Sequence, residues 1–317
     1  MAFLRNKRRK KRKTAYHYGS QKKRYRRLPL ALLFIGLAAF LYGAVRLGGY
    51  IASSIQAKQV SQQVAALYEE APEETAAPVQ EVYLADDEPE EPQAALLDTY
   101  QYIAPLRRQK LDSLWQQNND LVAWLTIDGV VSQPVVYRDN SYYINHDFYG
   151  KKSSAGTLFL DELSPLAAET QNLLIHGHNM KDGSMFAMLT HYKSADFAAQ
   201  HTIATLDTLY RTDTYVLIAV LPLETVEEED GQTYLNGDAL YFYSNPRFYS
   251  EKAFETYKTR LYAASTYHSA LDLNASDAIL SLSTCVSGSN GRIMTVFRRL
   301  RDGEDVNNLQ TTATPHN

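Results

Sequence analysis

The hydrophobic pattern divides the chain into a long apolar run, an acidic stretch and a body of short apolar segments. From Leu28 to Val45 no residue carries a charge, and beyond Arg46 the uncharged sequence continues as LGGYIASSI. At ~1.5 Å of rise per residue, about 20 residues cross the ~30 Å hydrocarbon core of a bilayer. Arg46 lies near the end of this run, where its long side chain can reach the interface. We therefore expect residues 28–50 to form a single transmembrane helix.

The charges on either side of this run predict its orientation. Residues 1–27 contain 13 Lys and Arg and no acid, whereas residues 28–317 contain 19 Lys and Arg against 36 Asp and Glu. Positive flanks stay in the cytoplasm, so we expect a basic cytoplasmic tail (1–27) and a single-pass protein of the cell membrane with its body outside. A cleaved signal peptide, ending near Ala52-Ser53-Ser54, is an alternative. So is a nucleic-acid-binding tail at KRRKKRK, but a basic run beside an apolar span favours the topology signal, and we expect no nucleic-acid partner.

Residues 51–98 have the composition of a spacer. Positions 59–98 contain 11 acidic residues and no Lys or Arg, and prolines stand at positions 72, 78, 89 and 92. Like charges repel and prolines interrupt helices, so we expect an extended, disordered linker that lifts the following domain off the membrane. Within it, the stretch from Gln56 to Tyr68 is able to prolong the membrane helix.

The body, residues 99–317, reads mainly as short strands. The region from Ile103 to Asn118 has the apolar spacing of one helical face, and Met185–Tyr192 and Phe254–Ala264 also read as helices. Many short strands with few helices favour a closed or nearly closed β-barrel with peripheral helices. The predicted strands are Val122–Ile127, Val130–Tyr137, Gly156–Leu160, Asn172–His176, Thr202–Leu206, Tyr215–Leu221, Ala278–Ser283 and Ile293–Arg299.

The composition draws attention to one side chain. The chain has 317 residues with 45% hydrophobic residues, which describes an ordinary globular protein rather than a fibrous or wholly disordered one. Its single cysteine, Cys285, excludes an intramolecular disulfide framework and a Cys-based zinc site. An unpaired thiol is a liability in an oxidising exterior. Cys285 is therefore the first candidate for chemistry.

Two further residues complete a candidate acyl-transfer site. Cys285 ends the strand-like run AILSLSTC and precedes the flexible segment VSGSNG, so its sulfur can face a groove. A thiol nucleophile needs a base or a cationic neighbour. His178 stands at another strand end, in LLIHGHNM, and Arg292 opens the strand after Cys285. A guanidinium stays charged and can hold a carbonyl or stabilise an oxyanion. Cys, His and Arg without a metal suit acyl transfer.

Three blocks, in order along the chain, resemble the sortase family and specifically its class B branch. They are Ser141–Asp161, Leu173–Phe186 and Leu280–Leu300. The third resembles the family's T-L-x-T-C motif with a downstream Arg, although here the match is to Leu-Ser-Thr-Cys. The resemblance implies a cysteine transpeptidase on the outer face of a Gram-positive bacterium, with an eight-stranded sortase barrel and extra helices. The Cys285–Arg292 loop is shorter than in typical class B members, which leaves signal preference open.

The resemblance also implies roles for individual residues. Cys285 would attack the carbonyl of a Thr in a C-terminal sorting signal, His178 would act as general acid and base, and Arg292 would steady the carbonyl and the oxyanion. Ser283 and Thr284 would contact substrate. The thioacyl-enzyme would pass to an amine of a cell-wall precursor or a pilin Lys, so the implied partners are the membrane, a signal-bearing surface protein or pilin, and that amine. No cofactor is implied.

Several alternatives remain at the level of sequence. His176 and His178 share one strand face and could bind zinc, and Glu224–Asp230 could bind calcium, but simpler interpretations favour no metal. Arg298 and Arg299 are alternative cations. The candidate groove residues are Tyr142, Tyr143, Tyr241 and Tyr243.

The function also has alternatives. A catalytically idle surface binding or adhesin domain on a sortase-like barrel would need none of the three polar groups, and their joint presence counts against it. A cysteine protease would use the same site with water as the acceptor.

Overall fold

The computed structural model describes most of the chain beyond the basic tail. The described residues are 28–71, 109–167, 170–227, 233–235, 241–243, 245–286, 291–306, 309 and 314–315. The expected tail (1–27) and the linker from residue 72 to residue 98 lie outside them. The chain forms two compact units, Met1–Ala52 and Ser53–Asn317.

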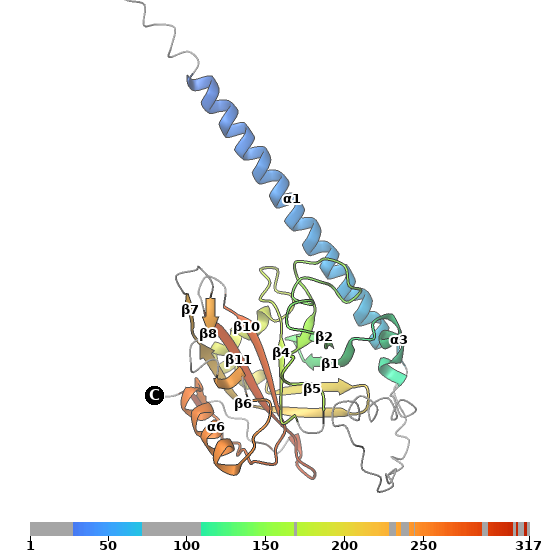
Figure 1. Ribbon diagram of the computed structural model, residues 1–317, viewed down its shortest axis with the longest axis vertical. Coiled ribbons are helices and arrows are strands. Elements are labelled where there is room, and N and C mark those ends of the chain that lie inside the picture. Colours follow the sequence, from blue (N-terminus) through green and yellow to red (C-terminus); the bar gives the residue numbers. More distant parts are fainter. Residues whose placement is uncertain are drawn as a thin grey trace, which may run out of the picture. The chain divides into compact units, whose positions relative to one another are not determined.

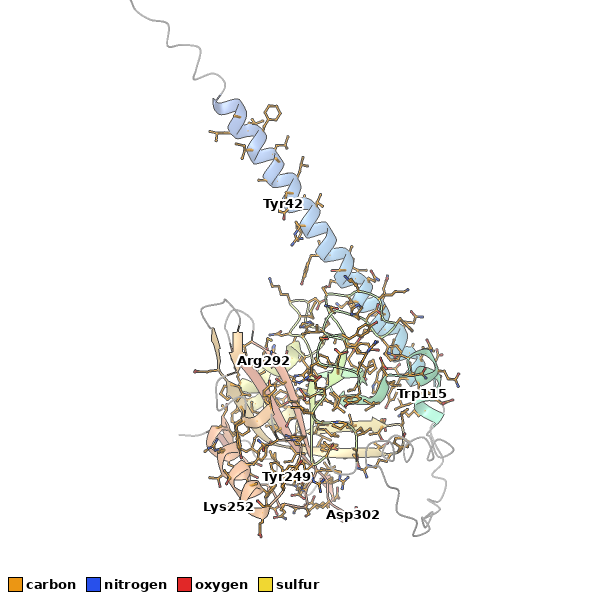
Figure 2. All side chains as sticks on the ribbon, viewed as in Figure 1. Tyr42, Trp115, Tyr249, Lys252, Arg292 and Asp302 are labelled. Carbon is orange, nitrogen blue, oxygen red and sulfur yellow. The ribbon has the colours of Figure 1, made fainter. Side chains whose placement is uncertain are left out.

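The first unit contains the apolar half of helix α1 (Leu28–Glu69). Its side chains are exposed from residue 31 onward, as Tyr42 illustrates with 69% of its surface accessible (Figure 2). Within the described chain, α1 is the one helix whose length and mean hydropathy, 1.9, suffice to cross a bilayer. An exposed apolar helix of this kind fits a membrane anchor or a signal segment.

The second unit begins inside α1, which differs from the expected linker. The helix continues past residue 51 to Glu69, as the stretch from Gln56 to Tyr68 allowed. Val64 is 1% exposed, and the Tyr68 ring stacks on Trp124 with 4.2 Å between centroids. The spacing of Val60 and Val64 places both on one helical face, which is covered by the body. The folded body therefore starts near residue 53 rather than residue 99, because this face buries apolar surface.

Eight strands of the described chain close a barrel in the order β1-β2-β3-β4-β10-β11-β6-β5 (Figure 1). The β2–β3 and β4–β10 pairs are parallel and the other pairs are antiparallel. This is the barrel that the resemblance predicted. Its strands are β1 (Leu121–Ile127), β2 (Val131–Val136), β3 (Leu158–Leu160), β4 (Asn172–His176), β5 (Ile203–Thr208), β6 (Thr212–Leu223), β10 (Ile279–Cys285) and β11 (Arg292–Arg299).

Peripheral elements cover the barrel. The predicted helix at Met185–Tyr192 is a 3₁₀ helix, η3 (Ala187–Lys193), followed by α4 (Ala195–Gln200). The Ser250 hydroxyl caps α6 by accepting from the Ala253 amide. The remaining elements are α3 (Gln109–Gln117), α6 (Glu251–Ala264), β7 (Thr225–Glu227), β8 (Thr233–Leu235), β9 (Tyr267–His268) and β12 (Thr314–Pro315).

Three apolar clusters hold these elements together. The largest fills the barrel and includes Leu125, Ile175 and Leu282, each 0% exposed. A second packs α6 against the outer face of β6, β10 and β11. The third lies beneath α1 and α3 and contains Val64 and Trp124. Strand ends are therefore fixed from both faces of the sheet, which positions the residues that follow them.

Removing the helical stretch 53–71 is expected to destabilise the barrel. A soluble chain that begins at residue 99 loses Val64 and uncovers Trp124, whereas one that begins at Ser53 keeps both buried. The buried Val alone contributes roughly 2 kcal/mol, so we expect the shorter chain to melt at least about 5 °C lower. Scanning calorimetry of the two chains tests this. Equal melting temperatures would contradict the assignment of 53–71 to the folded body.

Candidate active site

Cys285 and Arg292 face each other across an antiparallel strand pair. Cys285 is the last residue of β10, Arg292 is the first residue of β11, and the ladder pairs them directly. Such partners have Cα atoms roughly 4.5–5.5 Å apart. The Val286 amide donates to the Gly291 carbonyl at 2.8 Å, which closes the hairpin beyond them. The thiol of Cys285 is free and exposed. The register of two strands therefore brings the backbone positions that carry the thiol and the guanidinium together.

His178 reaches the same strand end from β4. Strands β4 and β10 run parallel, with His176 opposite Ser283. The Gly177 amide donates to the Ser283 carbonyl at 3.2 Å, and the Asn179 side-chain amide donates to the Cys285 carbonyl at 2.8 Å. These two bonds flank His178 and tie its backbone to the strand that carries the sulfur.

The residue before the histidine must be small. A Cβ on Gly177 would lie 2.4 Å from a Leu158 methyl carbon and 2.6 Å from the Phe186 ring, closer than real Cβ atoms approach. The glycine therefore allows β4 to end tightly against β3 and the turn that follows His178.

The His178 imidazole is oriented by one hydrogen bond. Its Nε2 atom lies 2.6 Å from the carbonyl oxygen of Ile144. A carbonyl only accepts, so Nε2 carries the hydrogen and Nδ1 is the basic nitrogen of the neutral ring. The side chain is half-buried. This arrangement leaves Nδ1 to accept or return a proton during a reaction.

The three residues line one pocket of about 270 Å³. Figure 2 labels Arg292 at its place on β11. Ser283 lines the same pocket, as expected for a substrate contact. The other lining residues are Asn140, Ile144, Thr157, Phe159, Asp161, His176, Gly177 and Tyr243. Sequence positions more than 100 residues apart thus meet around a cavity large enough for a peptide segment.

A chain of polar and aromatic contacts forms one wall of this pocket. His176 Nε2 lies 2.8 Å from Asp161 Oδ2, and the His176 and Tyr243 rings stack with 5.6 Å between centroids. The Tyr243 hydroxyl is hydrogen-bonded to Ser283, and the Arg292 guanidinium lies 6.0 Å from the Tyr243 ring centroid. The wall therefore connects four segments of the fold.

The charges of this wall follow from its contacts. Burial raises the pKa of Asp161, but hydrogen bonds from His176, the Leu163 amide and Asn140 outweigh it and leave the pKa below its usual range. Burial also raises the pKa of Tyr243, against the opposing effect of the Arg292 charge. The pocket therefore presents an ionised carboxylate and a neutral phenol at neutral pH.

Thr284 does not fit its expected role. It is 0% exposed, and its hydroxyl donates to the Gly177 carbonyl at 2.8 Å. Alternate strand residues point to opposite faces, so Thr284 shares the interior face of Leu280 and Leu282 while Ser283 and Cys285 share the pocket face. Thr284 supports the turn before His178 rather than lining the pocket.

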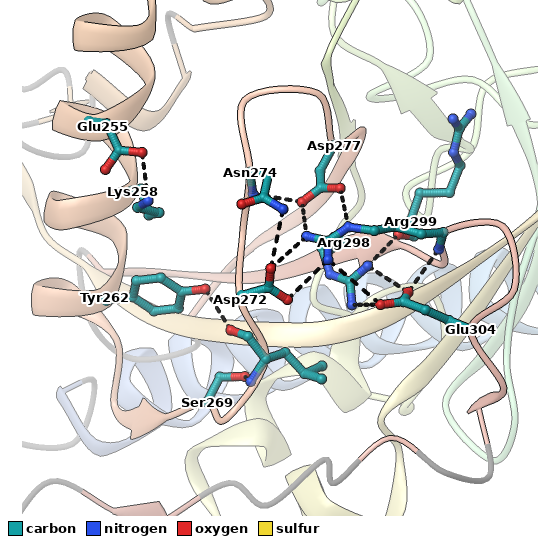
Figure 3. A network of polar contacts seen from close by, with 12 residues as sticks. Glu255, Lys258, Tyr262, Ser269, Asp272, Asn274, Asp277, Arg298, Arg299 and Glu304 are labelled. Atoms are coloured by element: carbon teal, nitrogen blue, oxygen red, sulfur yellow. Dashed lines mark hydrogen bonds and ion pairs between the residues drawn. The ribbon is translucent and has the colours of Figure 1, made fainter.

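The alternative cations are engaged in ion pairs. Arg298 is fully buried and binds Glu304 through two hydrogen bonds of 2.8 and 3.1 Å (Figure 3). Arg299 lies 3.8 Å from an Asp213 carboxylate oxygen. Neither residue lines the pocket. Of the three arginines, Arg292 is therefore the one that lines the pocket with Cys285.

The remaining alternatives concern metals and tyrosines. Among the described residues, no group of three or more His, Cys, Asp or Glu is arranged to hold a metal ion, and His176 is hydrogen-bonded to Asp161. Of the acidic segment Glu224–Asp230, residues 228–230 lie outside the described chain. Of the four candidate tyrosines, Tyr243 lines the pocket, whereas Tyr142, Tyr143 and Tyr241 are absent from its lining.

Sequence reasoning missed several residues of the site. Asn179 follows His178 directly, and an amide after a strand-end histidine is a signal that could have singled it out. Asp161 ends the first block in the same way, after Leu158–Leu160. Ile144 had no chemical signal, because its contribution is a backbone carbonyl.

The curated relatives and the solved structures that resemble this chain belong to the same family. No protein-family profile matches the chain. The sortase B of Listeria monocytogenes is 32% identical over 180 residues, which cover 56% of this chain and 68% of that protein. The structure of Bacillus anthracis sortase B in complex with AAEK1 superposes with a TM-score of 0.60 at 22% identity, covering 79% of this chain and 99% of that one. A Staphylococcus aureus sortase B–substrate complex superposes with a TM-score of 0.54 at 22% identity, covering 66% and 93%.

Proposed function

We propose, from the premise that this chain belongs to the sortase B family of cysteine transpeptidases, that it cleaves a C-terminal sorting signal after Thr and transfers the acyl group to an amine. The observation that carries the proposal is the convergence of Cys285, His178 and Arg292 on one pocket. The substrate would be a signal-bearing surface protein or a pilin. The acceptor would be a cell-wall precursor amine or a pilin Lys.

The first half-reaction would use all three groups. The Cys285 thiol gives its proton to Nδ1 of His178, which becomes an imidazolium. The sulfur attacks the Thr carbonyl carbon, and the developing oxyanion is stabilised by the Arg292 guanidinium. The C–N bond then breaks, the leaving amine takes a proton from the His178 imidazolium, and a thioester remains on Cys285. The pocket wall of His176 and Tyr243 would hold the peptide residues beside the scissile bond.

The second half-reaction would reverse these roles. An incoming amine attacks the thioester carbonyl and gives a proton to neutral His178, whose basic nitrogen in the structure is Nδ1. The C–S bond breaks and the sulfur leaves as thiolate. Water would compete as a slower acceptor, and the balance between the two acceptors separates a transpeptidase from a protease.

We also propose the cellular arrangement. Residues 28–50 would anchor the protein as a single span, with residues 1–27 in the cytoplasm and the barrel outside. The support is the exposed apolar surface of α1 and the excess of Lys and Arg before it. Protease protection of the basic tail in intact membrane vesicles tests the orientation.

Trapping and partitioning of the acyl-enzyme test the reaction. The full chain in detergent is incubated with a library of pentapeptide signals, and intact-mass spectrometry looks for a thioacyl adduct on Cys285. Adding a primary amine should then convert most of the adduct to ligated product. An adduct that passes only to water would favour the protease, and no adduct with any peptide would favour the idle binding domain.

Replacing Arg292 with Lys is expected to lower kcat/KM by about 10²-fold, the usual cost of removing one oxyanion donor. Lysine keeps the charge but lacks the planar fork that binds an oxygen from two nitrogens. Steady-state kinetics measure this. Arg247→Lys, on a residue outside the pocket, is the matched control and should retain full activity. Full activity of the Arg292 variant would reduce its role to that of a simple charge.

A further inference from the structure

The orientation of His178 depends on two supports. Its ring is held by the Ile144 carbonyl at 2.6 Å, and its backbone carbonyl accepts from the Phe186 amide at 2.9 Å. The first support belongs to the loop that precedes β3, and the second belongs to the hairpin that follows His178. A shift in either segment would move the imidazole relative to Cys285.

The hairpin support rests on the start of the α1 portion in the second unit. The hairpin runs from His178 to Phe186 and is closed by a bridge between Asn179 and Met185. Ser54 of α1 donates a hydrogen bond to Asp182 at the hairpin tip. The other Asp182 oxygen accepts from the Ser184 amide at 3.1 Å and hydroxyl at 2.6 Å. The helix is thus bonded to the residue that organises the tip.

The pKa of Asp182 reflects the same contacts. Burial raises it, and the hydrogen bonds from Ser184 and Ser54, together with the charge of Lys58, outweigh burial and lower it. Two of these stabilising groups, Ser54 and Lys58, come from α1. The carboxylate is therefore held ionised partly by the helix.

The Ile144 carbonyl is backed by a neighbouring layer of chain, residues 153–157. The chain from Ser153 to Thr157 lies against residues 143–145, with bonds from the Ser153 amide to the Asn145 carbonyl (2.9 Å) and from the Thr157 amide to the Tyr143 carbonyl (3.0 Å). Gly156 adopts a φ of +63°, which favours glycine, and a Cβ there would lie only 2.8 Å from the Ile144 carbonyl oxygen. No larger residue could pack so closely behind the carbonyl that holds His178.

The far side of this layer faces α1. A cavity of about 50 Å³ is lined by residues of both, and Thr157 lines this cavity as well as the catalytic pocket. The Ser53 hydroxyl of α1 also lies 3.3 Å from the Ser154 hydroxyl of this layer. The α1 residues that line it are Ala57, Lys58, Val60, Ser61 and Val64. A single layer of chain therefore separates α1 from the active site.

We propose that residues 53–58 of α1 are a positioning element for His178, acting through Asp182 on one side and through the layer behind Ile144 on the other. The proposal rests on the catalytic role proposed above for His178. It makes the segment that follows the apolar span part of the active-site support, and not only a connection to the membrane. Ser54 is the residue whose contact tests it most directly.

The experiment compares serine substitutions on the full chain in detergent. Ser54→Ala removes the bond to Asp182, and Ser54→Asp places a second carboxylate beside it. We expect kcat to fall about tenfold in Ser54→Ala and further in Ser54→Asp, because a small displacement of the His178 imidazole slows the reaction strongly. KM should change little in either variant. Ser54→Thr keeps the hydroxyl and should restore kcat.

Ser61→Ala is the matched control. Ser61 lies on the same helix beyond the proposed element, and its hydroxyl accepts a hydrogen bond from Gln133 of β2 at 2.6 Å rather than contacting Asp182. It should lower the melting temperature at least as much as Ser54→Ala while kcat stays normal. A loss of kcat in both variants in proportion to their melting temperatures would overturn the proposal, since only stability would then be at work.

A second readout does not depend on turnover. The proton on His178 Nε2, assigned by its loss in His178→Ala, should shift in the nuclear magnetic resonance spectrum of Ser54→Asp and stay in place in Ser61→Ala. An unshifted signal together with normal kcat in both Ser54 variants would reject the positioning role. If the wild-type chain forms no thioacyl adduct, the proposed function is wrong. The His178 proton signal would still show whether Ser54 of α1 affects the orientation of the His178 ring.

Discussion

Replacing Cys285 with alanine is expected to abolish cleavage of a sorting peptide, by at least about 10⁴-fold in kcat, because no other nucleophile can form the acyl-enzyme. The fold should be unaffected, since the thiol is exposed at the end of β10 and contributes no core contact. A quenched fluorescent peptide measures the rate, and calorimetry measures the melting temperature. Mass spectrometry should find no adduct on the variant.

The matched control is Ser283→Ala, two residues earlier on the same strand face. It removes a hydroxyl that is bonded to Tyr243 and lines the pocket, but leaves the thiol in place. Binding should weaken while the adduct still forms. Turnover of the Cys285→Ala protein at the wild-type rate would remove Cys285 from the reaction.

Replacing His178 with alanine is expected to lower kcat by about 10²- to 10⁴-fold, the range in which a general acid–base group contributes. The variant loses the proton donor for the leaving amine and the acceptor for the attacking amine. Single-turnover kinetics should show the loss in both the acylation and the transfer steps. The melting temperature should change little, because the side chain is only half-buried.

His191→Ala provides the comparison for this variant. His191 is an exposed histidine of η3 that does not line the pocket, so its removal should leave both steps unchanged. A His178 variant with a nearly normal rate would show that another group moves the proton. His176 would then be the next candidate, since it lines the same pocket beside Asp161.

Strand prediction from the sequence was close because the barrel strands carry local signals. All eight predicted strands are present, and Asn172–His176 has the predicted bounds. The runs of Val, Ile and Leu in β6 and β10 are buried on both faces, against the barrel interior and beneath α6. Such strands read as continuous apolar runs and are recognised without knowledge of their partners.

The elements that sequence reasoning misplaced depend on tertiary contacts. The stretch 53–69 is helical and packed, although it adjoins an acidic and proline-containing sequence, because Val64 and Tyr68 find a partner surface around Trp124. Thr284 points inward because the register of β10 assigns it to the barrel interior. The packing of 53–69 is not visible in the local pattern, since it is decided by which face meets another element. The position of Thr284 follows from strand alternation once Cys285 is placed in the pocket.

The candidate site divides in the same way. Its reactive side chains stand at strand ends, which a sequence pattern can locate. That pattern singled out Cys285, His178 and Arg292, and the family resemblance added Ser283. The groups that orient them are backbone carbonyls and amides, such as the Ile144 oxygen that holds His178. Backbone groups are common to every residue, so no residue type marks them.

The ladder between Cys285 and Arg292 allows the paired positions and the residues that connect them to be changed separately. Because the strand register pairs the two backbone positions and the Val286–Gly291 bond closes the ladder above them, we expect the intervening residues to tolerate exchange while Cys285 and Arg292 remain paired. Exchanging these residues would then separate changes in peptide preference from changes at the paired backbone positions. The hairpin is a natural place to diversify in a library for new ligation tags.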